Sequence, residues 1–390
     1  MEILIPPAGA EHLLRLLPGY ESFDPQSEVL FLRKPGFGLK DAPRLWLLAL
    51  KRVLLKLGAK PTNIDPQLYT IHVSGRLRLL LSIHVDDIKL TGEPDMMDRL
   101  IKGLEEHFDA LKLEKGNFLH LGLQHETLDD GSVRVSQQHY VNELREIPED
   151  KLRLMNKSDF VDEEYQKYFM SLIGGLAWCV QTRIDVAIFV GALQRRLQKP
   201  CVEDLLNLNR VLRYVKAKPL AMVFKKIPNP WRIVAISDSG FKGEDQDHLA
   251  IRSGIVALVG KDFPRLGDNN LQIVEFVSKK QTRVCRSTYS AELFSCLDLA
   301  GLAMNVSMTM SEILMGTMSA GELATLHESG NLALSCLSLD VVIDAAAVFE
   351  NLITEETKTP TDPSMLIHYC ERSLFQDFCG ATHAPCLRMV

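Results

Sequence analysis

The hydrophobic pattern of this chain changes its period twice, and this constrains the fold more than any other feature of the sequence. Apolar residues recur at helical spacing over residues 42–57, form two β-prone runs over 68–85, and return to helical spacing over 137–216. Beyond the proline-punctuated segment 225–230, three β-prone runs lead to a long apolar helix over 290–315. A chain of 390 residues, 46% of them hydrophobic, can bury two or three separate cores. We therefore predict a multi-domain protein of mixed helices and strands.

Charge, cysteine content and hydropathy limit the class of protein. The net charge of -6 excludes a chain-wide positive field, so any nucleic-acid site must be local. The eight cysteines contain no CxxC pair, which indicates reduced thiols rather than a disulfide framework. No apolar run approaches the roughly 18 to 20 residues that a membrane span needs. We expect a soluble protein of the cytoplasm or nucleus with no membrane partner.

The first candidate site is the pair Asp86 and Asp87. The hairpin predicted over residues 68–85 ends on these two carboxylates, which can bind a hard cation such as Mg²⁺ through oxygen atoms. Two-metal phosphoryl transfer needs carboxylates from separate elements that converge on ions about 4 Å apart. A single Asp-Asp turn does not meet that requirement, and a polar turn without chemistry is the alternative interpretation.

The second candidate site combines a strand with a helix. Asp238 follows the predicted strand 231–237, and Glu292 lies near the start of the predicted helix 290–315. Rigid elements of this kind can hold two carboxylates close enough to share cations. Taken singly, each acid would be an ordinary surface residue. The pair therefore predicts a metal-dependent nuclease only if the two elements pack against each other.

The motifs around these acids resemble those of copia-type retrotransposon Pol polyproteins. Residues 34–46, KPGFGLKDAPRLW, resemble the family segment YGLKQAPRxW, and residues 84–88 stand at its YVDD motif with His84 in place of Tyr. Five further segments resemble the family elements FLG, QxxY, YRSLVGSLLY, TRPDI and LRYLKGT, in this order: residues 121–123, 138–141, 168–176, 182–186 and 212–216. The resemblance implies a reverse transcriptase palm and thumb in which Asp86 and Asp87 are catalytic metal ligands.

One element of the family's polymerase site has no counterpart here. The family's first catalytic aspartate lies in an upstream motif like DVKTAFL, and no such motif precedes residue 30. Asp86 and Asp87 would then lack the third carboxylate of the metal site. We therefore expect polymerase activity to be lost by truncation unless an upstream Pol segment associates with the chain. Self-association is the other partner considered.

The later part of the chain resembles the ribonuclease H domains of the same family. Four segments resemble the series SDADWAGD, SGY and SKKQxxVxxSSTEAEY: residues 237–239, 252–254, 277–281 and 287–292. By this resemblance Asp238 and Glu292 are catalytic metal ligands, and Ser290 caps the helix that carries Glu292. The third carboxylate, in a DNQSAI-like motif, best matches Asp344, and Asp362 is a weaker match to a fourth acid. The implied cofactor is Mg²⁺ or Mn²⁺.

One basic segment stands out in this acidic chain. Its candidate nucleic-acid-binding side chains are Arg195, Arg196, Lys199, Arg210, Arg213 and Lys216. Such a patch binds phosphates by counterion release without reading sequence, as a clamp on an RNA/DNA hybrid must. A solvated helix surface is the alternative interpretation.

Together these features predict an α/β chain, an α+β palm and thumb remnant followed by an RNase H-like α/β domain. The expected segments are an irregular upstream remnant (1–30), a truncated palm (31–136), a thumb or helical connection (137–226), the RNase H-like domain (227–372) and a tail (373–390). The expected function is metal-dependent hydrolysis of RNA in RNA/DNA hybrids. The alternative is an inactive transposon remnant that only binds nucleic acid.

Overall fold

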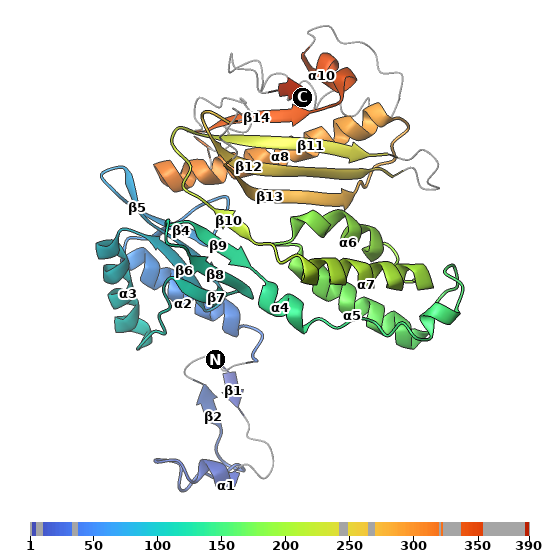
Figure 1. The fold of residues 1–390 in the computed structure, drawn as a ribbon. Coiled ribbons are helices and arrows are strands. Elements are labelled where there is room, and N and C mark those ends of the chain that lie inside the picture. The colour runs from blue at the N-terminus through green and yellow to red at the C-terminus, as the bar shows by residue number, and fades with distance from the viewer. Residues whose placement is uncertain are drawn as a thin grey trace. The chain divides into compact units, whose positions relative to one another are not determined.

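A computed structural model shows mixed helices and open sheets, which confirms the predicted α/β class. It describes residues 2–4, 11–32, 38–241, 249–263, 270–319, 321–322, 337–353 and 387–389 (Figure 1). The chain divides into two compact units. The first unit contains residues 1–60 and 81–111, and the second contains residues 61–80 and 112–390.

The first unit is built around two amphipathic helices. Its elements are β1 (Glu2–Leu4), α1 (Glu11–Leu14), β2 (Leu30–Leu32), α2 (Ala42–Lys56), β6 (Asp87–Gly92) and α3 (Pro94–Phe108). Helix α2 starts at Ala42 as predicted and has Pro43 in its first turn, where a missing N–H costs nothing. Gly58 follows with a φ of 89°, a left-handed conformation that glycine adopts readily at a helix end. A Cβ on Gly103 of α3 would overlap the side chain of Leu57, so the two helices approach closely at this glycine.

The predicted hairpin forms as expected and is followed by a strand that the sequence pattern did not indicate. Strands β3 (Lys60–Pro61), β4 (Leu68–Val73) and β5 (Arg76–His84) are followed by β6, and the sheet order is β3-β4-β5-β6. Strand β5 buries Leu79, Leu81 and Ile83 on one face, as strand alternation requires. The chain then turns at Val85, whose φ is 57°, and β6 begins at Asp87.

The second unit begins with a small sheet and a helical bundle. Its sheet has the order β10-β9-β8-β7 and is built from β7 (Asn117–His120), β8 (Leu123–Thr127), β9 (Val133–Ser136) and β10 (Met222–Phe224). The helices are α4 (Gln138–Glu143), α5 (Glu163–Cys179), α6 (Ala187–Gln194) and α7 (Val202–Ala217), with short 3-10 turns at Leu152–Leu154 and Ile184–Val186. Arg183, only 2% exposed, donates to both carboxylate oxygens of Asp185 at 2.9 Å and to the Val215 carbonyl at 3.0 Å. This buried guanidinium is therefore paired, as a charge in a core must be.

A five-stranded sheet covered by one long helix forms the rest of the second unit. Its elements are β11 (Trp231–Gly240), β12 (Ile251–Gly260), β13 (Leu271–Lys280), α8 (Thr288–Met315), β14 (Ser338–Ile343), α10 (Ala346–Ile353) and β15 (Leu387–Met389). The sheet order is β13-β12-β11-β14-β15. Strands β11, β12 and β13 pair antiparallel, and β14 pairs parallel with β11 (Figure 1).

Helix α8 is apolar on most of its surface because it packs on this sheet. Leu293, Leu299 and Ala303 of α8 lie in one buried cluster with Ile233 and Ala235 of β11. The helix is long and apolar enough to cross a membrane by length and composition, with half of the apolar window buried. Its contacts with the sheet are those of a core helix, for which the same composition is expected.

Gly254 of β12 provides a test of this packing. An added Cβ would lie 2.7 Å from the Ile236 carbonyl oxygen and 2.7 Å from Cδ2 of Leu299. We predict that Gly254→Ala lowers the free energy of unfolding by about 1–3 kcal/mol because backbone and helix must both shift. At Gly301 of α8 an added Cβ would meet no neighbouring atom within 4 Å. Gly301→Ala should therefore raise the free energy of unfolding by up to about 1 kcal/mol. Thermal unfolding of both variants checks this, and an unshifted midpoint for Gly254→Ala would contradict the close approach.

Candidate functional site

Three carboxylates converge in the second unit, from two strand ends and one helix. Asp238 lies near the end of β11, Asp344 directly follows β14, and Glu292 lies near the start of α8. One ligand atom from each lies within 4.8 Å of the others. The structure thus brings together the three acids that the sequence predicted for one metal site. Asp362 lies outside the described residues.

Strand pairing explains why two of these acids meet. Strands β11 and β14 are parallel, with Ile236 opposite Val342, so both strands end at the same edge of the sheet. Asp238 follows two residues after Ile236, and Asp344 follows two residues after Val342. Their carboxylates therefore leave the sheet at the same level.

Hydroxyl groups tie α8 to the end of β11. Ser295, three residues after Glu292, donates to the Asp238 carbonyl at 2.8 Å, and the Ser253 hydroxyl donates to the same oxygen at 3.2 Å. Ser237 donates to the Ser295 hydroxyl at 3.2 Å. These bonds fix the helix that carries Glu292 against the strand that carries Asp238. Sequence reasoning missed Ser295, although its position three residues from Glu292, on the same helix face, was an available signal.

The N-cap of α8 differs from the prediction by three residues. The helix begins at Thr288, and its N-cap is Ser287 rather than Ser290. The Ser290 N–H donates to the Ser287 hydroxyl at 3.2 Å, and the Ser287 N–H donates to the Ser290 hydroxyl at 3.2 Å. This reciprocal pair is a capping box, so Ser290 serves the cap from the third helical position. The prediction that Ser290 is the cap itself was wrong because two serines in the same segment fit the pattern.

The environment of Glu292 favours its protonated form. Partial burial, followed by the negative charges of Asp238 and Asp344, raises the pKa of Glu292 to about 7, while a hydrogen bond from the Ser239 backbone N–H opposes this shift. A divalent cation among the three oxygens would reverse the balance, because its charge stabilises the ionised form. Three carboxylates within this distance are the hard oxygen donors that Mg²⁺ and Mn²⁺ prefer. The residues therefore fit a divalent metal.

This shift predicts a pH-dependent stability for the metal-free protein. The folded chain holds the Glu292 proton up to about pH 7, whereas an unfolded Glu releases it near its usual pKa of 4.5. Stability conferred by the protonated group is therefore lost as pH rises from about 4.5 to about 7. Glu292→Gln should raise the thermal unfolding midpoint relative to wild type at pH 8 but not at pH 4, measured in EDTA. The exposed Glu106→Gln should show no such difference, and an equal effect at both pH values would contradict the shift.

Asp86 lies in the turn between β5 and β6 of the first unit, Asp87 is the first residue of β6, and both side chains are exposed. The Trp46 indole N–H of α2 donates to the Val85 carbonyl at 2.8 Å, and its ring packs at 5.0 Å from that of Phe108. The helix and the turn predicted from adjacent motifs are thus joined directly. Among the described residues, the structure assembles one group of metal-ligating side chains, the triad of Asp238, Glu292 and Asp344. Asp86 and Asp87 do not belong to the triad.

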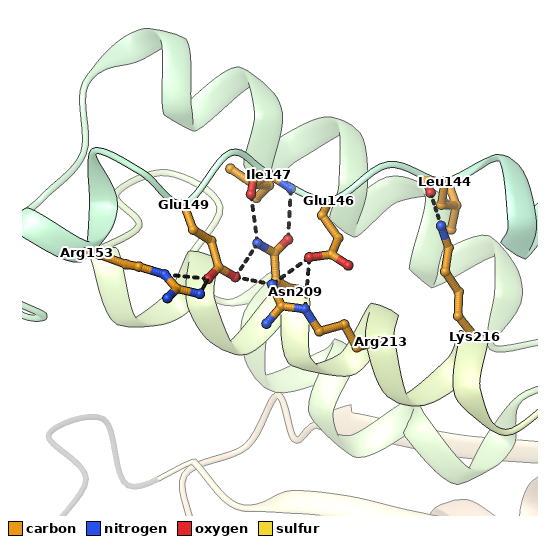
Figure 2. Close-up of polar contacts among 8 residues, drawn as sticks. All are labelled: Leu144, Glu146, Ile147, Glu149, Arg153, Asn209, Arg213 and Lys216. Atoms are coloured by element: carbon orange, nitrogen blue, oxygen red, sulfur yellow. Dashed lines mark hydrogen bonds and ion pairs between the residues drawn. The ribbon is translucent and has the colours of Figure 1, made fainter.

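Part of the predicted basic segment is engaged in contacts within the fold. Figure 2 shows Arg213 donating to Glu146 at 2.8 Å and pairing with Glu149, and Lys216 donating to the Leu144 carbonyl at 2.6 Å. Hydrogen bonds from Asn209 and Arg153 hold the pKa of Glu149 at about 2, so it stays ionised beside Arg213 at neutral pH. These side chains anchor the loop after α4 onto α7.

The other basic residues of the segment are placed differently. Arg210 donates to Asn207 at 2.9 Å, and the Lys199 ammonium lies 4.1 Å from the centre of the Phe160 ring. Arg195 and Arg196 follow the last residue of α6 and are exposed. Nucleic-acid binding by the segment remains a prediction.

Comparisons with known proteins place part of the chain beside a described family. Residues 11–152 match the reverse transcriptase (RNA-dependent DNA polymerase) family. The chain is 28% identical over 291 residues to the retrovirus-related Pol polyprotein from transposon RE1 of Arabidopsis thaliana, an alignment that covers 70% of this chain and 19% of that protein. The chain is similar to retrovirus-related Pol polyproteins of transposons. This confirms the resemblance that its motifs indicated.

Two further Pol polyproteins are similar to this chain. The one from transposon RE2 of Arabidopsis thaliana is 28% identical over 291 residues, covering 70% of this chain and 19% of that protein. The one from transposon TNT 1-94 of Nicotiana tabacum is 26% identical over 220 residues, covering 51% of this chain and 16% of that protein. The chain thus spans about a fifth of the length of the first relatives. Asp86 and Asp87 lie inside the matched reverse transcriptase region, and the triad lies beyond it.

Proposed function

We propose that the part of the chain from about residue 227 is an RNase H-like domain that hydrolyses the RNA strand of RNA/DNA hybrids. The observation that carries this proposal is the convergence of Asp238, Glu292 and Asp344 within 4.8 Å. Carboxylates from separate rigid elements are what metal-assisted phosphodiester hydrolysis needs. The sheet of three antiparallel strands with β14 parallel to β11, covered by α8, supports the same assignment.

The three acids have defined roles in this proposal. Asp238, Glu292 and Asp344 would hold Mg²⁺ or Mn²⁺ through single carboxylate oxygens. When bound, such ions supply an activated water and neutralise charge on the scissile phosphate. Ser295 positions Glu292 by its bond to the Asp238 carbonyl, and the Ser239 N–H orients the Glu292 carboxylate. The protein's own contribution is therefore the fixed separation of the ligands.

The substrate follows from the relatives. The matched family is named for RNA-dependent DNA polymerases, whose product is a hybrid of RNA and DNA. We propose that this hybrid is the partner of the chain, with Arg195, Arg196, Lys199 and Arg210 on its phosphates. Contact with an upstream Pol segment and self-association are compatible with this role. The proposed location is the cytoplasm or the nucleus, without a membrane.

Cleavage of a labelled RNA/DNA hybrid by the purified chain in Mg²⁺ tests the proposal. We predict cleavage that falls below roughly 1% of the wild-type rate in Asp238→Asn and in Glu292→Gln, because each removes a metal ligand. Asp87→Asn is the matched control and should cleave normally, since it lies in the other unit. Hybrid that binds without being cut by the wild-type chain would favour the alternative, a remnant that holds nucleic acid only.

For DNA synthesis at Asp86 and Asp87 we expect the opposite result, which is no activity. We propose that Asp86 and Asp87 do not support DNA synthesis by residues 1–390 alone, because among the described residues neither joins a group of three metal ligands. Primer extension on an RNA template should therefore give no product above that of the Asp86→Asn, Asp87→Asn double variant. Extension that requires both aspartates would refute this.

A further inference from the structure

A cavity of about 220 Å³ lies between helix α6 and the edge strand β13. Figure 1 shows α6 beside the edge of the five-stranded sheet. The cavity wall on the helix side includes Gly191 and Arg195, and the cavity wall on the strand side includes Ser278, Lys279 and Lys280. The residues on the two sides are more than eighty positions apart in the sequence, so only the fold assembles this cavity.

A glycine makes room for the cavity. A Cβ on Gly191 would lie 3.5 Å from the Ser278 carbonyl oxygen, an ordinary van der Waals distance, so the helix passes close to the strand edge there. A larger side chain at that position would fill the space between α6 and β13. The neighbouring surface keeps polar groups of Ser278 and the two lysines accessible, since Lys279 is exposed and Ser278 is half-buried.

The chemistry of the walls selects an anion. Arg195, Lys279 and Lys280 each carry a positive charge, and none of the described residues that line the cavity is acidic. Its volume is below the roughly 300–1,000 Å³ of pockets for drug-sized ligands, so a cofactor would not fit well. Arginine and lysine with a nearby hydroxyl are the donors that phosphate oxygens accept from.

The strand register places this cavity beside the triad. Asp238 pairs with Ser253, and Ser253 pairs with Ser278, so the three residues form one row across the sheet. Adjacent strands are about 4.8 Å apart, which puts the Ser278 backbone about 10 Å from that of Asp238. That distance corresponds to about three base pairs of a duplex at about 3.4 Å each. A duplex bound at the triad would therefore reach the cavity.

We propose that this cavity binds a backbone phosphate of the hybrid whose RNA strand lies at the triad. This inference rests on the proposed function for its ligand. It adds a second fixed point, on a strand whose backbone lies about 10 Å from that of Asp238, and so holds the duplex in register for cleavage. The contact reads no sequence, because phosphates carry none.

Binding of a fluorescent RNA/DNA hybrid to the Glu292→Gln chain, measured over a range of salt concentrations, tests the site. Adding Arg195→Ala and Lys279→Ala should weaken binding at least about fivefold and reduce the salt slope by about one, the value for one lost phosphate contact. Arg52→Ala with Lys261→Ala removes the same charge from exposed positions outside the cavity and should leave the slope unchanged. Arg195→Lys with Lys279 intact should retain most of the binding.

The outcomes separate this inference from the proposed function. The first outcome is that the chain with Arg195→Ala and Lys279→Ala binds the hybrid as well as the chain with Arg52→Ala and Lys261→Ala does, while the wild-type chain cleaves it. The phosphate site is then wrong and the proposed nuclease stands. Pocket-dependent binding without wild-type cleavage supports the site and removes the nuclease. If the Glu292→Gln chain does not bind the hybrid and the wild-type chain does not cleave it, both are wrong.

Discussion

The parallel pairing of β14 with β11 is the constraint on which the candidate site depends. These strands are separated by almost a hundred residues, and their pairing puts Asp344 level with Asp238 at one edge of the sheet. Helix α8 connects the antiparallel strands to β14 and packs across both, so Glu292 arrives at the same edge. A shift of one residue in the β11–β14 register would move Asp344 to the opposite face and dismantle the triad.

The same arrangement sets stability against function. One ligand atom from each of the three acids lies within 4.8 Å of the others, and partial burial, followed by the charges of Asp238 and Asp344, raises the pKa of Glu292. The hydrophobic cluster between α8 and the sheet supplies the opposing free energy, and the bonds of Ser295 and Ser253 to the Asp238 carbonyl keep the acids from separating. A site that is strained in this way without its cation is suited to bind one. The fold therefore holds the acids at an unfavourable electrostatic free energy, which the positive charge of a bound divalent cation would lower.

The sequence predicted the elements well because most of them have a clear period. The helix at 42–57 and the hairpin at 68–85 appear within one or two residues of the expected positions. Asp238 and Glu292 were found from motifs at a strand end and a helix start, and Asp344 from a weaker one. Strand β6 was missed because it begins at Asp87 itself, where two charged residues interrupt any strand pattern. The cap at Ser287 and the bond of Ser295 depend on side-chain geometry that spacing alone does not fix.

Positive charge alone did not identify a nucleic-acid surface, and the reason is compensation from distant sequence. Arg213 meets Glu146 and Glu149, which lie more than sixty residues earlier and were invisible to a local charge count. Arg195 instead shares a cavity wall with lysines from β13 that no local window would combine with it. A chain with a net charge of -6 can therefore present a phosphate site, because what attracts a polyanion is the field left after each cation's own partners are subtracted. The side of α6 that faces β13 gathers three cations from two distant segments at one cavity, so it is a better candidate than the more basic α7.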